Sequence, residues 1–295
     1  MTPQGARLID RAAVRRNFRR VAATYGAADF VAREVDARMQ ERLNYVRLTP
    51  EWIVDLGCGP GLSLPGLQGR YPKARCLGVD GEPAMLPRQI SPAGWRHWLP
   101  EAAKTTNMPQ FLAADACRLP LCAQSADLLW SNLLLPWLAD PLAFFRESLR
   151  CLKTGGLLMF SALGPDTLKE LRGGFARDGF AHTQRFADLH DLGDLLLEAG
   201  FADPVMDMEI LTLTYPTLDK LLADLRETGA TCAMQDRRRG LAGKTLRQNL
   251  EQHYETLRQQ EKLPATLEIL YGHAWKPAPR ITADGREILR FKPRR

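Results

Sequence analysis

The stretch IVDLGCGPG at residues 53–61 limits the possible folds of this chain more than any other. Apolar residues run into a glycine-rich turn and a helix-like segment follows, as in the first strand, turn and helix of a nucleotide-binding α/β unit. Glycine at positions 57, 59 and 61 allows positive φ angles and the close approach of a ligand to the main chain. The stretch therefore predicts a ligand-binding turn, although glycines needed only for chain geometry would give the same pattern.

The glycine spacing and one acid indicate which ligand the turn binds. A dinucleotide-binding turn has the spacing G-x-G-x-x-G, whereas this one has G-x-G-x-G preceded by Asp55. A carboxylate at this place repels a phosphate and attracts an ammonium or sulfonium group. We therefore expect S-adenosylmethionine, which carries both cations, rather than NAD. The sequence DLGCGPG resembles motif I of the class I methyltransferases.

Composition is that of an ordinary globular protein. The 295 residues are 45% apolar and 25% charged. No apolar run approaches the roughly 18 to 20 residues of a membrane span, and no secretory signal is evident, so we expect a cytoplasmic protein without membrane attachment. The six cysteines form no C-x-x-C pair and no zinc spacing with histidine, which predicts neither structural disulfides nor a metal site.

The net charge of +6 is partly concentrated in two basic segments. These are residues 237–239 (RRR) and the C-terminal cluster within residues 286–295. Either segment could attract an acidic partner, or could simply be solvated. No aromatic residues alternate with the basic ones and no RNA-binding module is evident, so we do not expect nucleic acid as a partner.

The order of the elements predicts a doubly wound α/β fold. Helical patterns cover residues 14–25 and 30–47, and we expect this N-terminal segment, residues 1–50, to form a helical lid over the ligand cleft. Residues 51–295 are expected to form a seven-stranded, Rossmann-like methyltransferase domain. Its predicted strands are residues 53–56, 74–79, 110–114, 126–131, 157–162, 204–215 and 266–275. Substrate-side helical elaborations are expected at about 164–200 and 216–262, the latter inserted before the last strand, which is expected to close the sheet as an antiparallel strand. A short helix is expected at about 83–89, and Asp166 is a candidate N-cap or first-turn acid of the helix after the fifth strand.

Strand ends predict where the cofactor binds, because ligands of open α/β sheets sit at the carboxyl ends of the strands. Asp80 ends the second strand, where an acid bonds a ribose diol, and Asp115 follows the third strand near the expected adenine. Asn132 and Leu133 leave the fourth strand, towards the methionyl group. The full predicted set is Asp55, Gly57, Cys58, Gly59, Gly61, Asp80, Gly81, Asp115, Ala116, Asn132 and Leu133.

Further motifs resemble one family of methyltransferases. Residues 161–172 (SALGPDTLKELR), 212–216 (TLTYP) and 224–230 (DLRETGA) are similar to the malonyl-acyl-carrier-protein O-methyltransferases of biotin synthesis. The resemblance spans nearly the whole chain and implies methylation of the free carboxylate of a malonyl thioester, held on acyl carrier protein or on coenzyme A. It also implies that Tyr25 closes on the cofactor. The chain departs from the family pattern at Pro136, which borders the expected acceptor pocket, and at Thr154.

The implied reaction predicts an unusual set of substrate residues. A malonyl carboxylate is ionised at neutral pH, so methyl transfer to it needs positioning rather than a general base. We expect a clamp for that carboxylate, and the guanidinium fork of arginine suits it. Candidates are Arg172 and Arg185, with His182 as a possible hydrogen-bond donor, although each of these could also be a surface or loop residue.

Three other functions fit parts of the sequence. A mitochondrial complex I assembly factor that hydroxylates arginine shares several motifs, another small-molecule O-methyltransferase would share the cofactor half, and a non-catalytic relative would keep the fold. The intact acids and glycines disfavour a non-catalytic relative. A monomer is expected, while the choice between carrier-protein and coenzyme A thioesters stays open.

Overall fold

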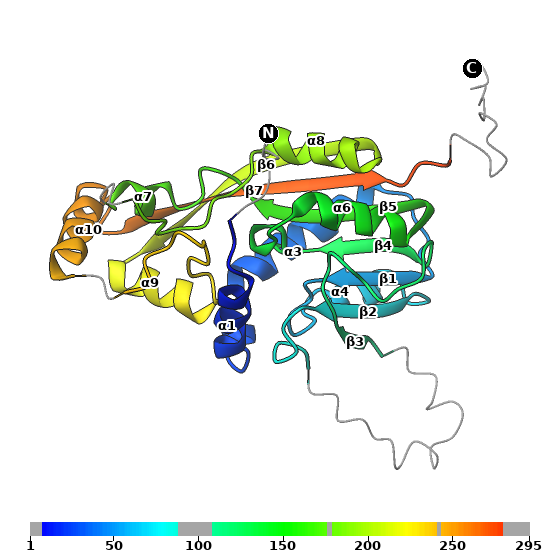
Figure 1. The fold of residues 1–295 in the computed structure, drawn as a ribbon, viewed down its shortest axis with the longest axis horizontal. Helices are drawn as coiled ribbons and strands as arrows, with labels where there is room; N and C mark the ends of the chain where they lie inside the picture. The colour runs from blue at the N-terminus through cyan, green and yellow to red at the C-terminus, as the bar shows by residue number, and fades with distance from the viewer. Residues whose placement is uncertain (1–7, 88–107, 176–178, 241–242, 280–295) are drawn as a thin grey trace, which may run out of the picture.

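A seven-stranded sheet with the order β3-β2-β1-β4-β5-β7-β6 forms the centre of the molecule (Figure 1). The computed structural model describes residues 8–87, 108–175, 179–240 and 243–279. Strands β1 to β5 are parallel, while β7 runs antiparallel to both of its neighbours. The strands are β1 (Trp52–Leu56), β2 (Arg75–Asp80), β3 (Gln110–Ala113), β4 (Ala126–Ser131), β5 (Leu152–Leu163), β6 (Ala202–Tyr215) and β7 (Leu263–Trp275). The predicted fold class is confirmed.

Helices pack on both faces of the sheet, because alternate residues of the central strands are buried on opposite sides. Ile53 of β1 and Met159 of β5 pack against α3 (Phe30–Arg42) and α4 (Leu64–Arg70). Val54 and Phe160 pack against α6 (Pro141–Cys151) and α8 (Leu189–Ala199) on the other face. The two-layer cover is that of a doubly wound sheet.

Strands β6 and β7 continue beyond the parallel sheet and support a second group of helices. Strand β5 pairs with β7 only as far as Leu163 opposite Ile269, whereas β6 pairs with it to Tyr215 opposite Leu263. The extension is covered by α7 (Lys169–Gly173), α9 (Leu218–Glu227) and α10 (Lys244–Thr256) (Figure 1). These helices correspond to the elaborations that the sequence predicts, while the domain boundaries themselves stay predictions.

The last strand takes a different place from the predicted one. The sequence predicts residues 266–275 as the strand that closes the sheet, but β7 is inserted between β5 and β6, and β6 forms the edge. Burial gives the physical reason: β7 is buried along almost its whole length, whereas β6 alternates between half-buried and exposed residues, as an edge strand does.

Helix α1 lies at the carboxyl ends of the parallel strands, between the sheet and α9 (Figure 1). Helix α1 (Arg11–Val21) begins at Asp10, whose side chain accepts a hydrogen bond from the backbone N–H of Ala13 at 3.0 Å. The short α2 (Tyr25–Ala28) and then α3 follow, and a 3-10 turn, η1 (Leu43–Tyr45), ends the segment. The two predicted helical patterns are confirmed, but α1 begins and ends earlier than residues 14–25, and α3 ends before residue 47.

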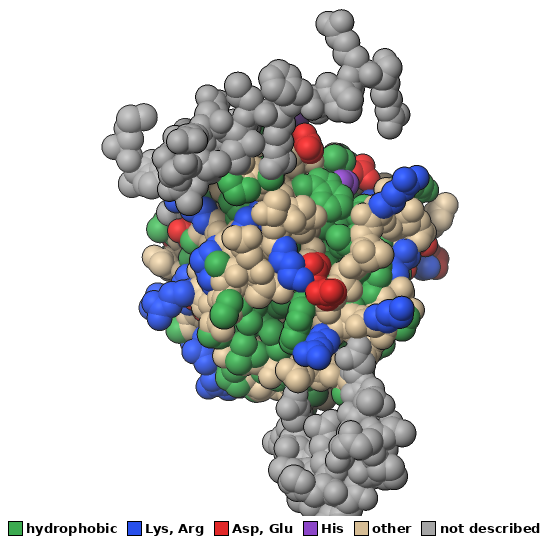
Figure 2. Space-filling model, turned by 90° about the vertical axis from the view of Figure 1, so that its right-hand side faces the viewer, with side chains coloured by type: hydrophobic (Ala, Val, Ile, Leu, Met, Phe, Trp, Pro, Cys, Tyr) green, Lys and Arg blue, Asp and Glu red, His purple; other side chains and the backbone are tan. Residues whose placement is uncertain are grey.

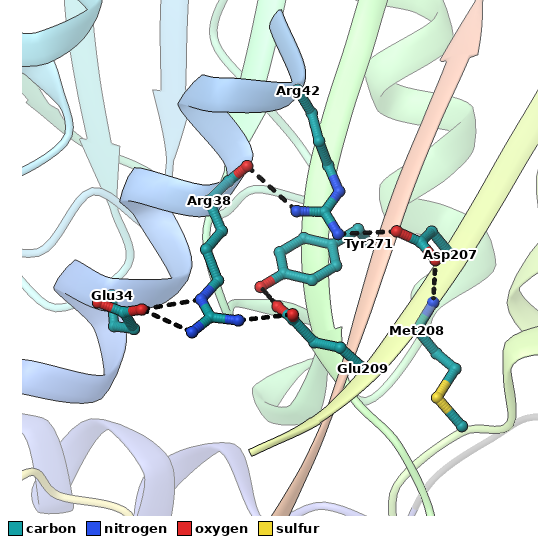
Figure 3. Close-up of polar contacts among 7 residues, drawn as sticks. All are labelled: Glu34, Arg38, Arg42, Asp207, Met208, Glu209 and Tyr271. Atoms are coloured by element: carbon teal, nitrogen blue, oxygen red, sulfur yellow. Dashed lines mark hydrogen bonds and ion pairs between the residues drawn. The ribbon is translucent and has the colours of Figure 1, made fainter.

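Two arginines fix α3 to the β6–β7 ribbon (Figure 3). Arg38 pairs with Glu209 at 2.6 Å, and Arg42 pairs with Asp207 at 2.7 Å while its guanidinium lies 3.7 Å from the ring centre of Tyr271. The hydroxyl of Tyr271 donates to Glu209. Because α3 lines the cavity described below, these contacts position one wall of it.

Two local predictions are wrong. A helix is predicted at residues 83–89, but residues 82–86 form a turn, with backbone hydrogen bonds from Met85 to Glu82 and from Leu86 to Pro83; residues 88 and 89 lie outside the described residues. Asp166 was expected to cap or begin the next helix, yet α7 begins after Leu168, because the N–H of Asp166 donates to Glu268 and its carboxylate pairs with Lys169. Within the described ranges, every helix is too short or too polar to cross a membrane.

Candidate functional site

The glycine turn between β1 and α4 is held close to β2. The N–H groups of Gly57 and Cys58 donate to the carbonyl of Val79 at 2.7 and 3.0 Å. Gly57, Gly59 and Gly61 have φ angles of 75°, 52° and 82°, which a residue with a Cβ seldom adopts. A Cβ on Gly57 would lie 2.8 Å from Leu134. The turn therefore needs its glycines, and it leaves the main chain open to a neighbouring ligand.

A cavity of about 1200 Å³ opens beside this turn, at the carboxyl ends of the strands. It exceeds the roughly 300 to 1,000 Å³ of a pocket for one small ligand, so it has room for a cofactor together with an acceptor. One end is lined by residues predicted for the cofactor: Tyr25, Gly57, Gly59, Asp80, Gly81, Asp115, Ala116, Asn132 and Leu133.

An adjoining cavity of about 460 Å³ has an acidic wall. It shares Tyr25, Asp29, Gly57 and Asn132 with the large cavity and is also lined by Asp55. Asp55 is 1% exposed and Asp29 is 2% exposed. Oδ1 of Asp29 pairs with Arg33 at 2.8 Å, yet Oδ2 of each carboxylate has no hydrogen-bond partner. Buried carboxylate oxygens are seldom left unpaired. These two oxygens therefore fit a ligand that brings hydrogen-bond donors, and above all a cation.

Burial also changes the acidity of these groups. It raises the pKa of Asp55 well above its usual range, and the nearby charges of Asp36 and Asp80 raise that pKa further. Asp36 itself accepts hydrogen bonds from Trp130 at 3.0 Å and from Gln40 at 2.6 Å. A bound cation would reverse the shift, because it favours the ionised form of Asp55.

The second-strand acid is fixed by the backbone. Asp80 accepts hydrogen bonds from the N–H of Gly59 at 3.0 Å and from the N–H of Glu82 at 2.8 Å. Burial raises its pKa, while these two hydrogen bonds oppose the rise. Asp115 accepts from the N–H of Cys117 at 2.9 Å and pairs with Arg11 of α1 at 3.4 Å. Both carboxylates line the large cavity and keep acceptor capacity for a ligand.

The residues that follow β4 form hydrogen bonds with α3 and with β5. Asn132 donates to the carbonyl of Ala32 in α3 at 2.7 Å and accepts from the hydroxyl of Ser161 in β5 at 2.8 Å. Leu133, with a φ of 54°, donates its N–H to the same hydroxyl at 2.9 Å. Three elements thus meet where the sequence predicts the methionyl group.

Cys58 and Gly61 lie on different sides of the turn. Cys58 is buried and lines the smaller cavity. Gly61 lines neither cavity within the described residues, and a Cβ on it would lie 2.7 Å from the ring of Phe111. Gly61 therefore serves the close packing of turn against β3.

The other end of the large cavity is mostly apolar and extends under α7 and α9. Its lining includes Leu163, Leu168, Leu171, Phe175, Leu213, Tyr215, Leu221, Leu225, Ala265 and Leu267. His182 lines this end too, stacked on Phe175 with ring centres 4.0 Å apart, while its role toward a substrate stays a prediction. Pro136 contacts this end only indirectly, because its carbonyl accepts from Gln184, which lines the cavity.

The two predicted arginines have other contacts. The guanidinium of Arg172 donates to the carbonyls of Pro165 and Thr167, and Arg185 pairs with Asp236. Neither belongs to the lining of the large cavity within the described residues. Their role as a carboxylate clamp stays a prediction, and it would require each side chain to exchange its present partners for the substrate.

Sequence reasoning missed three charged residues near the site. Asp29 precedes α3, Glu82 is 4% exposed and pairs with Arg15 and Arg19 of α1, and Arg226 lies at the end of α9. All three line one of the cavities. The only sequence signal is an acid four residues after Tyr25 and an acid two residues after Asp80, and both are common on a protein surface.

Comparison with known proteins agrees with this geometry. A family model described as "Methyltransferase domain" matches residues 54–160. The malonyl-[acyl-carrier protein] O-methyltransferase of Gallionella capsiferriformans is 47% identical, with 96% of this chain and 97% of the relative covered. The protein of that name from Methylovorus sp. is 44% identical, with 98% and 97% covered. This chain belongs to the malonyl-[acyl-carrier protein] O-methyltransferase family.

Membership of this family confirms the resemblance found in the sequence. It makes the chain a methyltransferase, with S-adenosylmethionine as the cofactor. Solved structures show the fold alone: the YcgJ protein from Bacillus subtilis has a TM-score of 0.56 at 14% identity and covers 84% of this chain and 100% of its own. A putative methyltransferase from Bacillus halodurans has a TM-score of 0.54 at 14% identity, covering 82% and 99%.

Proposed function

We propose that this protein transfers the methyl group of S-adenosylmethionine to the free carboxylate of a malonyl group carried as a thioester on acyl carrier protein, the entry step of biotin synthesis. The observation that carries the proposal is the similarity to proteins of that name at 44–47% identity over nearly the whole chain. The two-ended cavity beside the glycine turn supports it, because the cavity has room for both reactants.

The acidic cavity supports a particular orientation of the cofactor. Asp55 and Asp29 would bind the methionyl ammonium with their unpaired oxygens, and Asp80 would accept from the ribose. Asp115 and Ala116 would lie at the adenine, with Tyr25 as a cover over the methionyl part. In this orientation the glycine turn runs along the cofactor, and the apolar end of the cavity stays open for the acceptor.

The chemistry requires little proton transfer. S-adenosylmethionine supplies a methyl group on a positively charged sulfur. The malonyl carboxylate is already ionised at neutral pH, so an oxygen–methyl bond forms as the sulfur–methyl bond breaks, and no base has to remove a proton. The cavity walls would align carboxylate and methyl and exclude water, and alignment of this kind lowers a barrier by about 7 to 11 kcal/mol. His182 lines the end of the cavity that would hold the acceptor.

Methyl transfer from labelled S-adenosylmethionine to malonyl-acyl carrier protein tests the proposal directly. Acetyl-acyl carrier protein is the matched control, because it lacks only the free carboxylate. We expect label in the malonyl protein alone, released by mild base as methanol from the ester. Label in neither protein, from an enzyme that still binds S-adenosylhomocysteine, would contradict the proposed acceptor.

A further inference from the structure

Helix α1 presents an unusual concentration of positive charge at the opening of the large cavity. It contains five arginines (Arg11, Arg15, Arg16, Arg19 and Arg20) and no acid. Four of the five, all except Arg20, line the cavity. The end of α9 lies beside α1, because Asn17 donates to the carbonyl of Thr231 at 3.3 Å and a Cβ on Gly229 would lie 3.2 Å from Phe18. Arg226, in the last turn of α9, also lines the cavity.

These arginines divide into two groups. Arg11 pairs with Asp115, and Arg15 and Arg19 pair with Glu82, so these three attach α1 to the cofactor end of the sheet. Arg16, Arg20 and Arg226 are exposed, and among the described residues none forms a hydrogen bond or an ion pair with their guanidinium groups. Arg16 and Arg20 are also one turn apart on the helix, where like charges repel. An acidic partner would relieve this repulsion.

The basic segments expected from sequence to dock a partner are less suitable. Arg237 is 14% exposed and pairs with Asp10 at 2.9 Å, so it fastens the start of α1. Arg238 lies over the ring of Phe180, 5.9 Å from its centre. The C-terminal cluster lies outside the described residues. At the end of the molecule that faces the viewer in Figure 2, lysines and arginines are scattered among apolar and uncharged groups rather than gathered.

We propose that Arg16, Arg20 and Arg226 form the docking surface for the acidic carrier protein, with its acyl arm entering the cavity between α1 and α9. This inference rests on the proposed function. The arm is joined to its protein through a phosphodiester, and arginine's planar fork suits both phosphate and carboxylate groups. Docking at this rim would direct the malonyl carboxylate towards the cofactor end, since Arg16 and Arg226 line the same cavity as Asp80 and Asn132.

The test compares two substrates that share the malonyl thioester. We would measure kcat/KM for malonyl-acyl carrier protein and for malonyl-pantetheine, which lacks both protein and phosphate, in the wild type and in the R16E/R20E/R226E variant. In the variant, we expect kcat/KM for malonyl-acyl carrier protein, divided by kcat/KM for malonyl-pantetheine, to fall by about 10- to 100-fold relative to the wild type. Docking charges act mainly on association, which only the carrier-protein substrate requires. R47E is the matched control, since Arg47 is exposed, lies in the segment that enters β1, and lines neither cavity.

The outcomes separate this inference from the proposed function. A wild type that methylates malonyl-pantetheine and malonyl-acyl carrier protein, with an unchanged ratio in the variant, would overturn the docking surface alone. A wild type inactive on both would overturn the proposed function. If the variant lost as much kcat/KM for malonyl-coenzyme A as for malonyl-acyl carrier protein, the arginines would be assigned to the phosphate of the arm, and protein docking would be overturned. Should the triple variant fail to bind S-adenosylhomocysteine, R20E alone gives the same comparison, since Arg20 does not line the cavity.

Discussion

Two buried carboxylates beside one glycine turn are costly unless something pairs with them. Asp55 and Asp29 are almost completely buried; Oδ1 of Asp29 pairs with Arg33 at 2.8 Å, but Oδ2 of each carboxylate has no donor. An unpaired buried acceptor costs about 1 to 3 kcal/mol, and an ionised one costs more. In the proposed orientation of the cofactor, its ammonium group would lie beside these two oxygens. We therefore interpret them as half of an interaction that the cofactor would complete.

The raised pKa of Asp55 predicts how cofactor binding depends on pH. Burial first, and then the charges of Asp36 and Asp80, keep Asp55 protonated at pH values where an ordinary aspartate, with a pKa of about 3.9, is ionised. An ammonium binds only the ionised form, so binding should release a proton, and affinity should rise with pH through the raised pKa. Calorimetry with S-adenosylhomocysteine, repeated at several pH values and in buffers of different ionisation enthalpy, measures both the affinity and the number of protons released.

Replacing Asp55 by asparagine removes the charge of the side chain but keeps its shape. In D55N we expect weaker binding of S-adenosylhomocysteine and a flatter pH profile, because the group can no longer ionise. D194N is the matched control, since Asp194 is exposed on α8. A D55N profile as steep as that of the wild type would assign the proton to another carboxylate.

At the level of elements, Glu82 connects α1 to the cofactor end of the sheet. It follows Asp80, the predicted ribose ligand, by two residues, is 4% exposed, and pairs with Arg15 at 3.3 Å and Arg19 at 3.0 Å. Burial opposes its ionisation, but the two arginines and the N–H of Ala84 outweigh burial and lower its pKa. The position of α1 is therefore coupled to the segment that binds the cofactor.

Replacing Glu82 by glutamine should loosen α1 without unfolding the sheet. In E82Q we expect faster amide exchange in residues 11–21 and a loss of about 1 kcal/mol in the free energy of unfolding, since both arginines are more than half exposed and solvent screens their charges. Hydrogen exchange with mass spectrometry measures the first quantity. E198Q, which breaks an exposed pair with Arg146, should leave exchange in α1 unchanged. Equal exchange in both variants would contradict the coupling.

Features that depend on residues close together in the sequence could be predicted, whereas features that depend on residues far apart in the sequence could not. The glycine turn, the strand-end acids and the apolar strands are local patterns, so the fold class was predictable from them, and so were most residues that line the cavities beside the glycine turn. The positions of β7 and Arg237 depend on distant partners: β7 is central because β6 covers its other edge, and Arg237 is only 14% exposed because it pairs with Asp10. Asp29 was missed for the same reason, since only the folded chain brings it to the cavity that Asp55 lines.

At the scale of the whole molecule, the sheet and the β6–β7 extension enclose one cavity with two different ends. The cofactor end is formed by the strand ends and the N-terminal helices, and the acceptor end by α7, α9 and the extended ribbon. The arrangement allows both reactants to be bound at once, with neither leaving before the other enters. In the proposed function, the acceptor would lie away from Asp55, so the two ligands would have separate binding residues.

This arrangement predicts sequential kinetics. Initial rates measured over a grid of both substrate concentrations should give intersecting double-reciprocal lines, because the carboxylate takes the methyl group directly within a ternary complex. S-adenosylhomocysteine should compete with S-adenosylmethionine and should not compete with the malonyl thioester, since the two occupy different ends of the cavity. Parallel lines would instead mean that the methyl group passes first to the protein. His182 and Cys232, which both line the cavity, would then be the groups to examine for a methyl adduct by mass spectrometry.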